Sequence, residues 1–209
     1  QRCIEAFHYK GLALEKVNRT DESIHAFEVL LEIDPRNGDA QYHKGLALAK
    51  LSDHRDAIDA FEKTIDILPS FAPAWYNKGR SLIQTGKYQG AIDAFNRAVE
   101  IESGYTDVYY YKGFALLKLE KYHEAIESLD KNLEKDTSNA QGYYHKGLAL
   151  SKLERYEESL KAFDKALIYD PENALIFYQK GRAYIGLNQY SEAVFAFEKT
   201  LQLKPKYLN

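Results

Sequence analysis

The residues of this 209-residue chain that could support chemistry are six histidines, one cysteine and a glycine-lysine pair. No two histidines have the spacing that places metal ligands on one helix face. Cys3 is the only cysteine, which excludes an internal disulfide or a zinc site built from cysteines. Gly86-Lys87 continues with Tyr88, not with Ser or Thr, so it does not match a phosphate-binding loop. The sequence therefore disfavours an enzyme, and we predict no cofactor and no metal.

A regular spacing of glycines predicts the structural units that position the side chains of this chain. Glycine recurs every 34 residues at Gly11, Gly45, Gly79, Gly113, Gly147 and Gly181. A fixed register without insertions indicates equal units that stack side by side. We predict a single array over residues 4–207, with repeats 4–37, 38–71, 72–105, 106–139, 140–173 and 174–207.

Within each unit the apolar residues fall at helical spacing. In the third unit Trp75, Gly79 and Leu82 share one helix face, and Ala91 and Phe95 mark a second amphipathic segment. Glycine on the first face allows a neighbouring helix to approach closely. Two short helices cannot bury both apolar faces alone, so neighbouring units must stack. The sequence predicts an all-α protein with two helices per repeat.

The junctions between units carry helix-ending and helix-starting residues. Prolines predicted to end second helices are Pro35, Pro69, Pro171 and Pro205. Asn37, Asn139 and Asn173 can cap the first helices that follow. The third unit ends without proline, so we expect a bend or altered stagger at residues 103–107. The fourth unit has Leu129 where the other copies have Phe, and Asn132 where a small residue is usual, so we expect looser packing there.

Composition limits the classes of partner. The chain has 28 lysines and arginines against 31 acids, a net charge of −3, and 45% hydrophobic residues. This balance lacks the positive excess of a dedicated nucleic-acid binder. No apolar run is long enough to cross a bilayer, and the N-terminus has no export signal, so we predict a cytoplasmic location. The chain begins without methionine, and we expect a fragment of a longer protein.

These motifs together resemble the tetratricopeptide repeat (TPR) family over nearly the whole chain. The resemblance rests on four features in one register: the 34-residue period, the motif aromatic-x3-Gly-x2-Leu/Tyr in the first helix, the motif Ala-x3-Phe in the second helix and the terminal proline. The Tyr-x-Lys-Gly motif is most similar to that of archaeal arrays. It implies an α-solenoid, a right-handed superhelix of antiparallel helix pairs whose first helices line the concave face. It also implies a non-catalytic protein-interaction scaffold.

A line of tyrosines would mark that concave face. Three residues before the glycines lie His8, Tyr42, Tyr76, Tyr110, Tyr144 and Tyr178. Tyrosine offers large contact area and one hydroxyl, so we predict a groove for a partner peptide or helix, neutral to acidic and partly apolar. The predicted contact residues are Tyr42, His43, Tyr76, Asn77, Arg80, Tyr110, Tyr111, Phe114, Leu117, Tyr144, His145, Tyr178 and Arg182. The alternative is that these tyrosines mainly pack neighbouring helices together.

Two further features of the first helices have structural interpretations. Lysine precedes every glycine, and its stem can cover apolar surface while the ammonium reaches a carboxylate. The TPR resemblance would place His8 and His43 on neighbouring helices near Glu5 and Asp39. A metal site there is conceivable, but two polar residues on a binding face are favoured.

Three other functions were weighed against peptide binding. The TPR clamp for chaperone tails matches this sequence only at Asn77, so binding by that clamp is disfavoured. Self-association by stacking through the terminal repeats is the alternative function, because the apolar faces of these repeats could stack end to end. Its candidate residues are Phe195, Tyr207 and Leu208, and Phe195 replaces polar residues of the other copies. RNA binding is disfavoured by the negative net charge.

Overall fold

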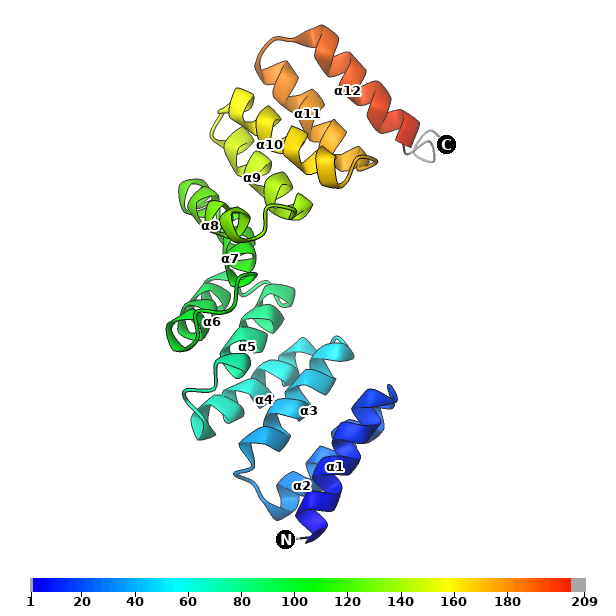
Figure 1. Cartoon of the computed structure of the whole chain (residues 1–209), viewed down its shortest axis with the longest axis vertical. Helices are drawn as coiled ribbons and strands as arrows, with labels where there is room; N and C mark the ends of the chain where they lie inside the picture. The colour runs from blue at the N-terminus through cyan, green and yellow to red at the C-terminus, as the bar shows by residue number, and fades with distance from the viewer. Residues whose placement is uncertain (1, 204–209) are drawn as a thin grey trace. The chain divides into compact units, whose positions relative to one another are not determined.

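The computed structural model describes residues 2–203. Within this range the chain forms twelve α-helices and no strand, and short turns join the helices (Figure 1). The helices are α1 (Arg2–Lys16), α2 (Thr20–Ile33), α3 (Gly38–Lys50), α4 (His54–Ile67), α5 (Ala72–Gln84), α6 (Tyr88–Ile101), α7 (Val108–Lys118), α8 (Tyr122–Lys135), α9 (Ala140–Lys152), α10 (Tyr156–Tyr169), α11 (Ala174–Gly186) and α12 (Tyr190–Leu203). The predicted all-α solenoid of two helices per repeat is confirmed.

The chain divides into two compact units, Gln1–Tyr105 and Thr106–Asn209. The first unit contains α1 to α6, and the second contains α7 to α12. In each unit the first helix of a repeat packs on its second helix, which in turn packs on the first helix of the next repeat. The division falls within residues 103–107, where the third repeat lacks a terminal proline.

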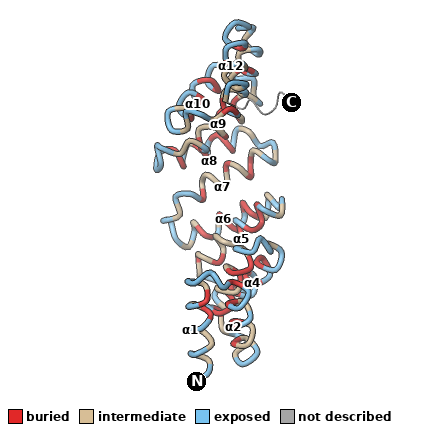
Figure 2. Tube along the Cα trace, turned by 90° about the vertical axis from the view of Figure 1, so that its right-hand side faces the viewer, coloured by how far each residue is buried: buried red, intermediate tan, exposed pale blue. Residues whose placement is uncertain are grey.

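The periodic glycines permit the close contact inside each helix pair. A methyl group at Gly79 would lie 2.6 Å from Cε1 of Phe95, and one at Gly147 would lie 2.5 Å from Cε1 of Phe163. Both rings are fully buried. Buried residues recur along the helices of both units (Figure 2). The predicted role of glycine as the site of close helix approach is confirmed.

The capping predictions are also confirmed where the structure describes them. The side chain of Asn37 accepts a hydrogen bond from the amide of Ala40 at 3.0 Å, and that of Asn139 accepts one from the amide of Gly142 at 2.9 Å. Helix α2 ends at Ile33, two residues before Pro35. Short-range chemistry therefore sets where these helices begin and end.

The fourth repeat does not show the looser packing expected from its sequence at Leu129 and Asn132. Leu129 is fully buried, like Phe27, Phe61, Phe95 and Phe163 at the same position of other repeats. Asn132 is buried as well, and its oxygen accepts a hydrogen bond from the Asn139 amide at 2.8 Å. A smaller apolar side chain and a hydrogen-bonded amide fill this space, so the expectation is wrong at these two positions.

Lysines that precede a glycine join consecutive repeats within each unit. Lys44 Nζ lies 2.8 Å from Glu28 Oε1, and Lys78 Nζ lies 2.8 Å from Glu62 Oε1. The same pair of positions is bridged in the second unit by Lys146 with Asp130 and by Lys180 with Asp164. The predicted structural role of these lysines is confirmed. Each ion pair is partly exposed and contributes about 0–1 kcal/mol to the free energy of unfolding. The bridges therefore favour the correct register between neighbouring repeats more than they stabilise the fold.

In the part of the chain that the structure describes, no helix is long and apolar enough to cross a membrane.

Candidate functional site

The predicted contact residues lie on the first helices of the repeats, and we call the surface that they form in each unit the first-helix face. In the first unit the hydroxyl of Tyr42 accepts a hydrogen bond from Asn77 Nδ2 at 3.2 Å. The Tyr42 ring meets the edge of Phe71 at a centroid distance of 5.0 Å. Burial raises the pKa of Tyr42 to about 12. Tyr76 stacks on Tyr105 at 4.8 Å. The hydrogen bond with Asn77 shows that Tyr42 joins two neighbouring repeats, and the stacking on Tyr105 shows that Tyr76 packs within its own repeat.

In the second unit Tyr110 and Tyr144 are half-buried, whereas Tyr178 is exposed. Burial raises the pKa of Tyr110 and of Tyr144 above the ordinary value. Tyr178 is 43% exposed. The Tyr144 ring lies 6.1 Å from the Phe163 ring, and the Tyr178 ring lies 5.8 Å from the Phe197 ring. Each of these two tyrosines therefore rests on the second-helix phenylalanine of its own repeat.

His145 is an interior residue, which corrects its prediction as a contact for a partner. Its side chain is only 9% exposed. The ring lies within 5.2–5.6 Å of the rings of Tyr110, Phe114 and Tyr144. Burial lowers the pKa of His145 to about 4, with a backbone hydrogen bond to Gln141 acting in the opposite direction and the positive charge of Lys118 adding a smaller lowering effect. His145 therefore links α7 to α9 and leaves almost no surface for a ligand.

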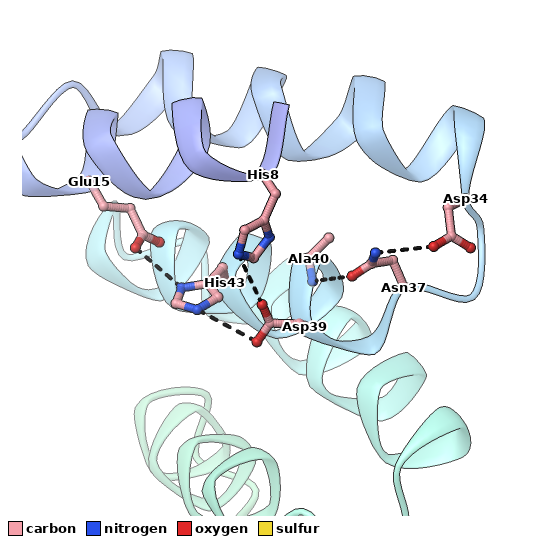
Figure 3. Close-up of polar contacts among 7 residues, drawn as sticks. All are labelled: His8, Glu15, Asp34, Asn37, Asp39, Ala40 and His43. Carbon is pink, nitrogen blue, oxygen red and sulfur yellow. Dashed lines mark hydrogen bonds and ion pairs between the residues drawn. The ribbon is translucent and has the colours of Figure 1, made fainter. Parts of the chain in front are cut away.

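His8 and His43 form a polar cluster between α1 and α3 (Figure 3). His8 Nε2 lies 3.3 Å from Asp39 Oδ2, and His43 Nδ1 lies 3.2 Å from Glu15 Oε2. The carboxylate that α1 supplies is thus Glu15, not the predicted Glu5. Among the described residues no group of three or more His, Cys, Asp or Glu could hold a metal ion. The cluster joins two neighbouring first helices.

The remaining predicted residues keep part of their surface open. Arg80 and Arg182 are exposed, and the Arg80 guanidinium lies 5.7 Å from the centre of the Tyr76 ring. Other half-buried predicted residues are Asn77, Tyr111, Phe114 and Leu117. Phe195 on α12 is 59% exposed, and Lys199 Nζ lies 5.8 Å from its ring centre. Tyr207 and Leu208 lie outside the described residues.

Each unit has a pocket on its first-helix face. The first-unit pocket has a volume of about 270 Å³ and is lined by Leu46, Ala49, Lys50, His54, Asn77, Arg80, Ser81 and Gln84. The second-unit pocket has a volume of about 220 Å³ and is lined by Leu117, Leu148, Ser151, Lys152, Tyr156, Gln179, Arg182 and Ala183. Sequence analysis identified the arginines but missed Lys50 and Lys152 as site residues. Both lysines lie five residues after the glycine of their repeats, and this shared position could have identified them from the sequence.

Comparison with sequence families gives matches to models described as tetratricopeptide repeat. The matched residues are 10–73, 72–105, 140–173 and 174–207. None of these ranges includes residues 106–139, the repeat that carries Leu129 and Asn132. A comparison with curated proteins gives no significant match.

Solved structures with the same fold are numerous. YrrB, described as a TPR protein with an unusual peptide-binding site, is 23% identical, with a TM-score of 0.74 over 86% of this chain and 93% of that chain. MamA from Desulfovibrio magneticus RS-1 is 22% identical, with a TM-score of 0.77 over 82% and 97%. The C-terminal part of a TPR protein from Cytophaga hutchinsonii is 19% identical, with a TM-score of 0.79 over 94% and 78%. At these identities the likeness shows the fold.

Proposed function

Because the chain belongs to the tetratricopeptide repeat family, we propose that it is a non-catalytic protein-interaction scaffold whose first-helix face binds a partner peptide or helix. The proposed partner is neutral to acidic and partly apolar. YrrB, which shares the fold, is described as having a peptide-binding site, and this supports the proposal by analogy.

The observation that carries the proposal is the repeated aromatic and aliphatic surface of the first helices. Tyr144 and Tyr178 each rest on a buried or half-buried phenylalanine of their own repeat. This support orients the rings before any ligand arrives, which reduces the entropy lost on binding. Phe114 and Leu117 add half-buried apolar area on α7. Such a surface, flanked by exposed arginine, suits a segment with apolar and acidic side chains.

The test begins with peptides selected by phage display on the intact chain. We expect enriched peptides to bind more weakly, by about tenfold, to a variant that combines Leu117→Ala with Tyr178→Ala, because two apolar anchors are lost. The matched control is Glu127→Ala on the exposed side of α8, which should leave affinity unchanged. Calorimetry measures the affinities, and circular dichroism checks the fold. Unchanged affinity in a folded double variant, or the absence of any enriched peptide, would contradict the proposal.

A second candidate function is self-association through α12. Val194 and Leu201 are 56% and 47% exposed, whereas Ile58 and Ile65 at the same repeat positions are buried by the next repeat. Phe195, which follows Val194 on the same helix, is also exposed. Contiguous apolar surface of this kind marks interaction sites.

Charge favours a second copy of the chain as the occupant of that surface. Glu198 holds the position that Glu28 and Glu62 use to bind the lysine of the next repeat, and Lys10 holds the matching lysine position in the first repeat. A copy whose first repeat packed on α12 would pair Lys10 with Glu198. Sedimentation velocity should show mass that rises with concentration. Glu198→Lys should weaken association and adding Lys10→Glu should restore it. A constant monomer mass would contradict this candidate.

A further inference from the structure

We propose that Asn37 is a modification site, at which the side-chain amide is converted spontaneously to a carboxylate by ring closure with the main chain of Gly38. Asn37 is the only asparagine of the chain that is followed by glycine. Glycine has no Cβ, so its amide nitrogen can reach the side-chain carbon of the preceding residue with the least steric hindrance. The product would alter the junction between the first and second repeats. This inference is independent of the proposed peptide binding.

The reaction needs only water as a co-reactant. The main-chain nitrogen of Gly38 forms a bond with Cγ of Asn37, and the bond between Cγ and Nδ2 breaks. The side-chain nitrogen leaves as ammonia, which carries the proton of the Gly38 amide. Water then opens the cyclic imide at either carbonyl carbon and gives aspartate or isoaspartate, in which the main chain runs through Cγ. Water is consumed and ammonia is released, and no group is oxidised or reduced.

Capping and packing together place this reactive pair at the start of α3. Asn37 caps the helix, because its Oδ1 accepts a hydrogen bond from the amide of Ala40 at 3.0 Å. A methyl group at Gly38 would lie 2.7 Å from Cδ1 of Leu68, so glycine is required there. Leu68 stands at a position where the first, third, fourth and fifth repeats have Asp or Glu. The large side chain of Leu68 therefore explains why glycine follows the capping asparagine in this repeat.

The folded turn restrains the reaction but leaves the nucleophile in place (Figure 3). Nδ2 of Asn37 donates a hydrogen bond to Oδ2 of Asp34 at 3.1 Å, and Oδ1 is bonded to the amide of Ala40. Ring closure turns Cγ toward the main chain, so both bonds must break. The negative charge of Asp34 also opposes further negative charge at this turn. Gly38 is the first residue of α3, so its main-chain N–H has no acceptor within the helix.

Either product would weaken the turn between α2 and α3. Aspartate lacks the N–H that Asn37 donates to Asp34, and it would place two carboxylates side by side, where like charges repel. Isoaspartate adds a methylene group to the main chain, so the hydrogen bonds of Asn37 with the amides of Ala40 and Gln41 cannot both be kept. The first turn of α3 should therefore lose protection from hydrogen exchange.

Asn173 provides a matched control within the same chain. Its side chain also caps a first helix, and its Nδ2 donates a hydrogen bond to Oδ2 of Asp170 at 2.7 Å. Ala174 follows it, so the same cap is present without the glycine. Comparison of the two asparagines therefore separates the effect of the following residue from the effect of the cap.

Peptide mapping by mass spectrometry, on the intact chain aged in mildly alkaline buffer, tests the site. We expect Asn37 to convert at least about tenfold faster than Asn173, because only Asn37 precedes a residue without Cβ. Ala174→Gly should accelerate conversion of Asn173, and Asp34→Ala should accelerate that of Asn37 by freeing its amide. Equal rates at the two asparagines, or an intact Asn37 in the folded chain while the urea-unfolded chain converts, would overturn the proposal. An unchanged rate in Asp34→Ala would overturn the restraint by the turn.

Hydrogen exchange followed by nuclear magnetic resonance tests the consequence. We expect the amides of Ala40 and Gln41 to exchange faster in the aged chain, whereas the amide of Gly142, bonded to Asn139 in the same way, should keep its rate. Asn37→Ser retains a capping residue but cannot form the imide, so it should age without loss of protection. Unchanged exchange in a converted chain, or the same loss in aged Asn37→Ser, would overturn the link between the modification and the start of α3.

Discussion

Acidification should destabilise the second unit through His145, which is buried among Tyr110, Phe114 and Tyr144. The pKa of His145 falls from 6.5 to about 4 in the folded chain because burial disfavours the charged ring. Between these pH values the unfolded chain binds a proton that the folded chain does not. The free energy of unfolding therefore falls as the pH falls from 6.5, and this loss is complete below the folded pKa.

The size of the effect follows from the two pKa values. One pKa unit corresponds to about 1.4 kcal/mol, so the shift of His145 corresponds to about 3 kcal/mol between pH 7 and pH 4. Carboxylates also titrate in this range, so the measurement must compare variants. His145→Phe keeps a ring among the three aromatic neighbours but cannot be protonated. The wild type should lose about 3 kcal/mol more than this variant over the same pH interval.

Urea unfolding at several pH values measures this difference. Circular dichroism is the required signal, because the single tryptophan, Trp75, lies in the other unit. His123→Phe is the control, since His123 is exposed and meets solvent in both states. Its pH profile should match that of the wild type. A His145→Phe profile parallel to the wild type between pH 7 and pH 4 would refute the reasoning.

Three further predictions test the packing of the repeats. Gly79→Ala should lower stability by up to about 2 kcal/mol, because a methyl group 2.6 Å from Phe95 overpacks the pair by about 1–3 kcal/mol against a helix-propensity gain of about 1 kcal/mol; urea unfolding that shows a gain in stability would contradict this. Gly90→Ala, measured in the same way, should raise stability by up to about 1 kcal/mol, because its nearest atoms lie at 3.6 Å or beyond, and a loss would contradict the contact argument. A double-mutant cycle on Lys44→Met and Glu28→Gln should give a coupling of about 0–1 kcal/mol that decreases with salt, and a salt-independent coupling would contradict an exposed ion pair.

The helices and their junctions could be predicted from the sequence because each depends on residues close together in the chain. Asn37 caps the helix that begins beside it, and Pro35 follows the helix that it ends. The contact of Gly79 with Phe95 lies within one repeat, so the period of 34 reveals it. The lysine bridges were predicted as structural, although the sequence did not identify acids such as Glu28 as their partners.

The candidate site was only partly predictable. His43 and His145 occupy the same position of their repeats, yet His145 is almost covered while His43 retains some exposure beside Glu15. The preceding repeat differs between the two cases, since Phe114, whose ring lies beside that of His145, stands where the first repeat has Leu12. The pairing of Lys50 with Arg80 in one pocket likewise required the structure, because the two residues belong to different repeats.

The sequence by itself determined the family, the helix pairs and the repeat register, since periodic burial and capping are encoded within one 34-residue unit. Only the tertiary structure decided which first-helix side chains are covered, which remain open and which cations share a pocket. The physical reason is that the exposure of a side chain in a stacked array is set by the neighbouring repeat that packs against it.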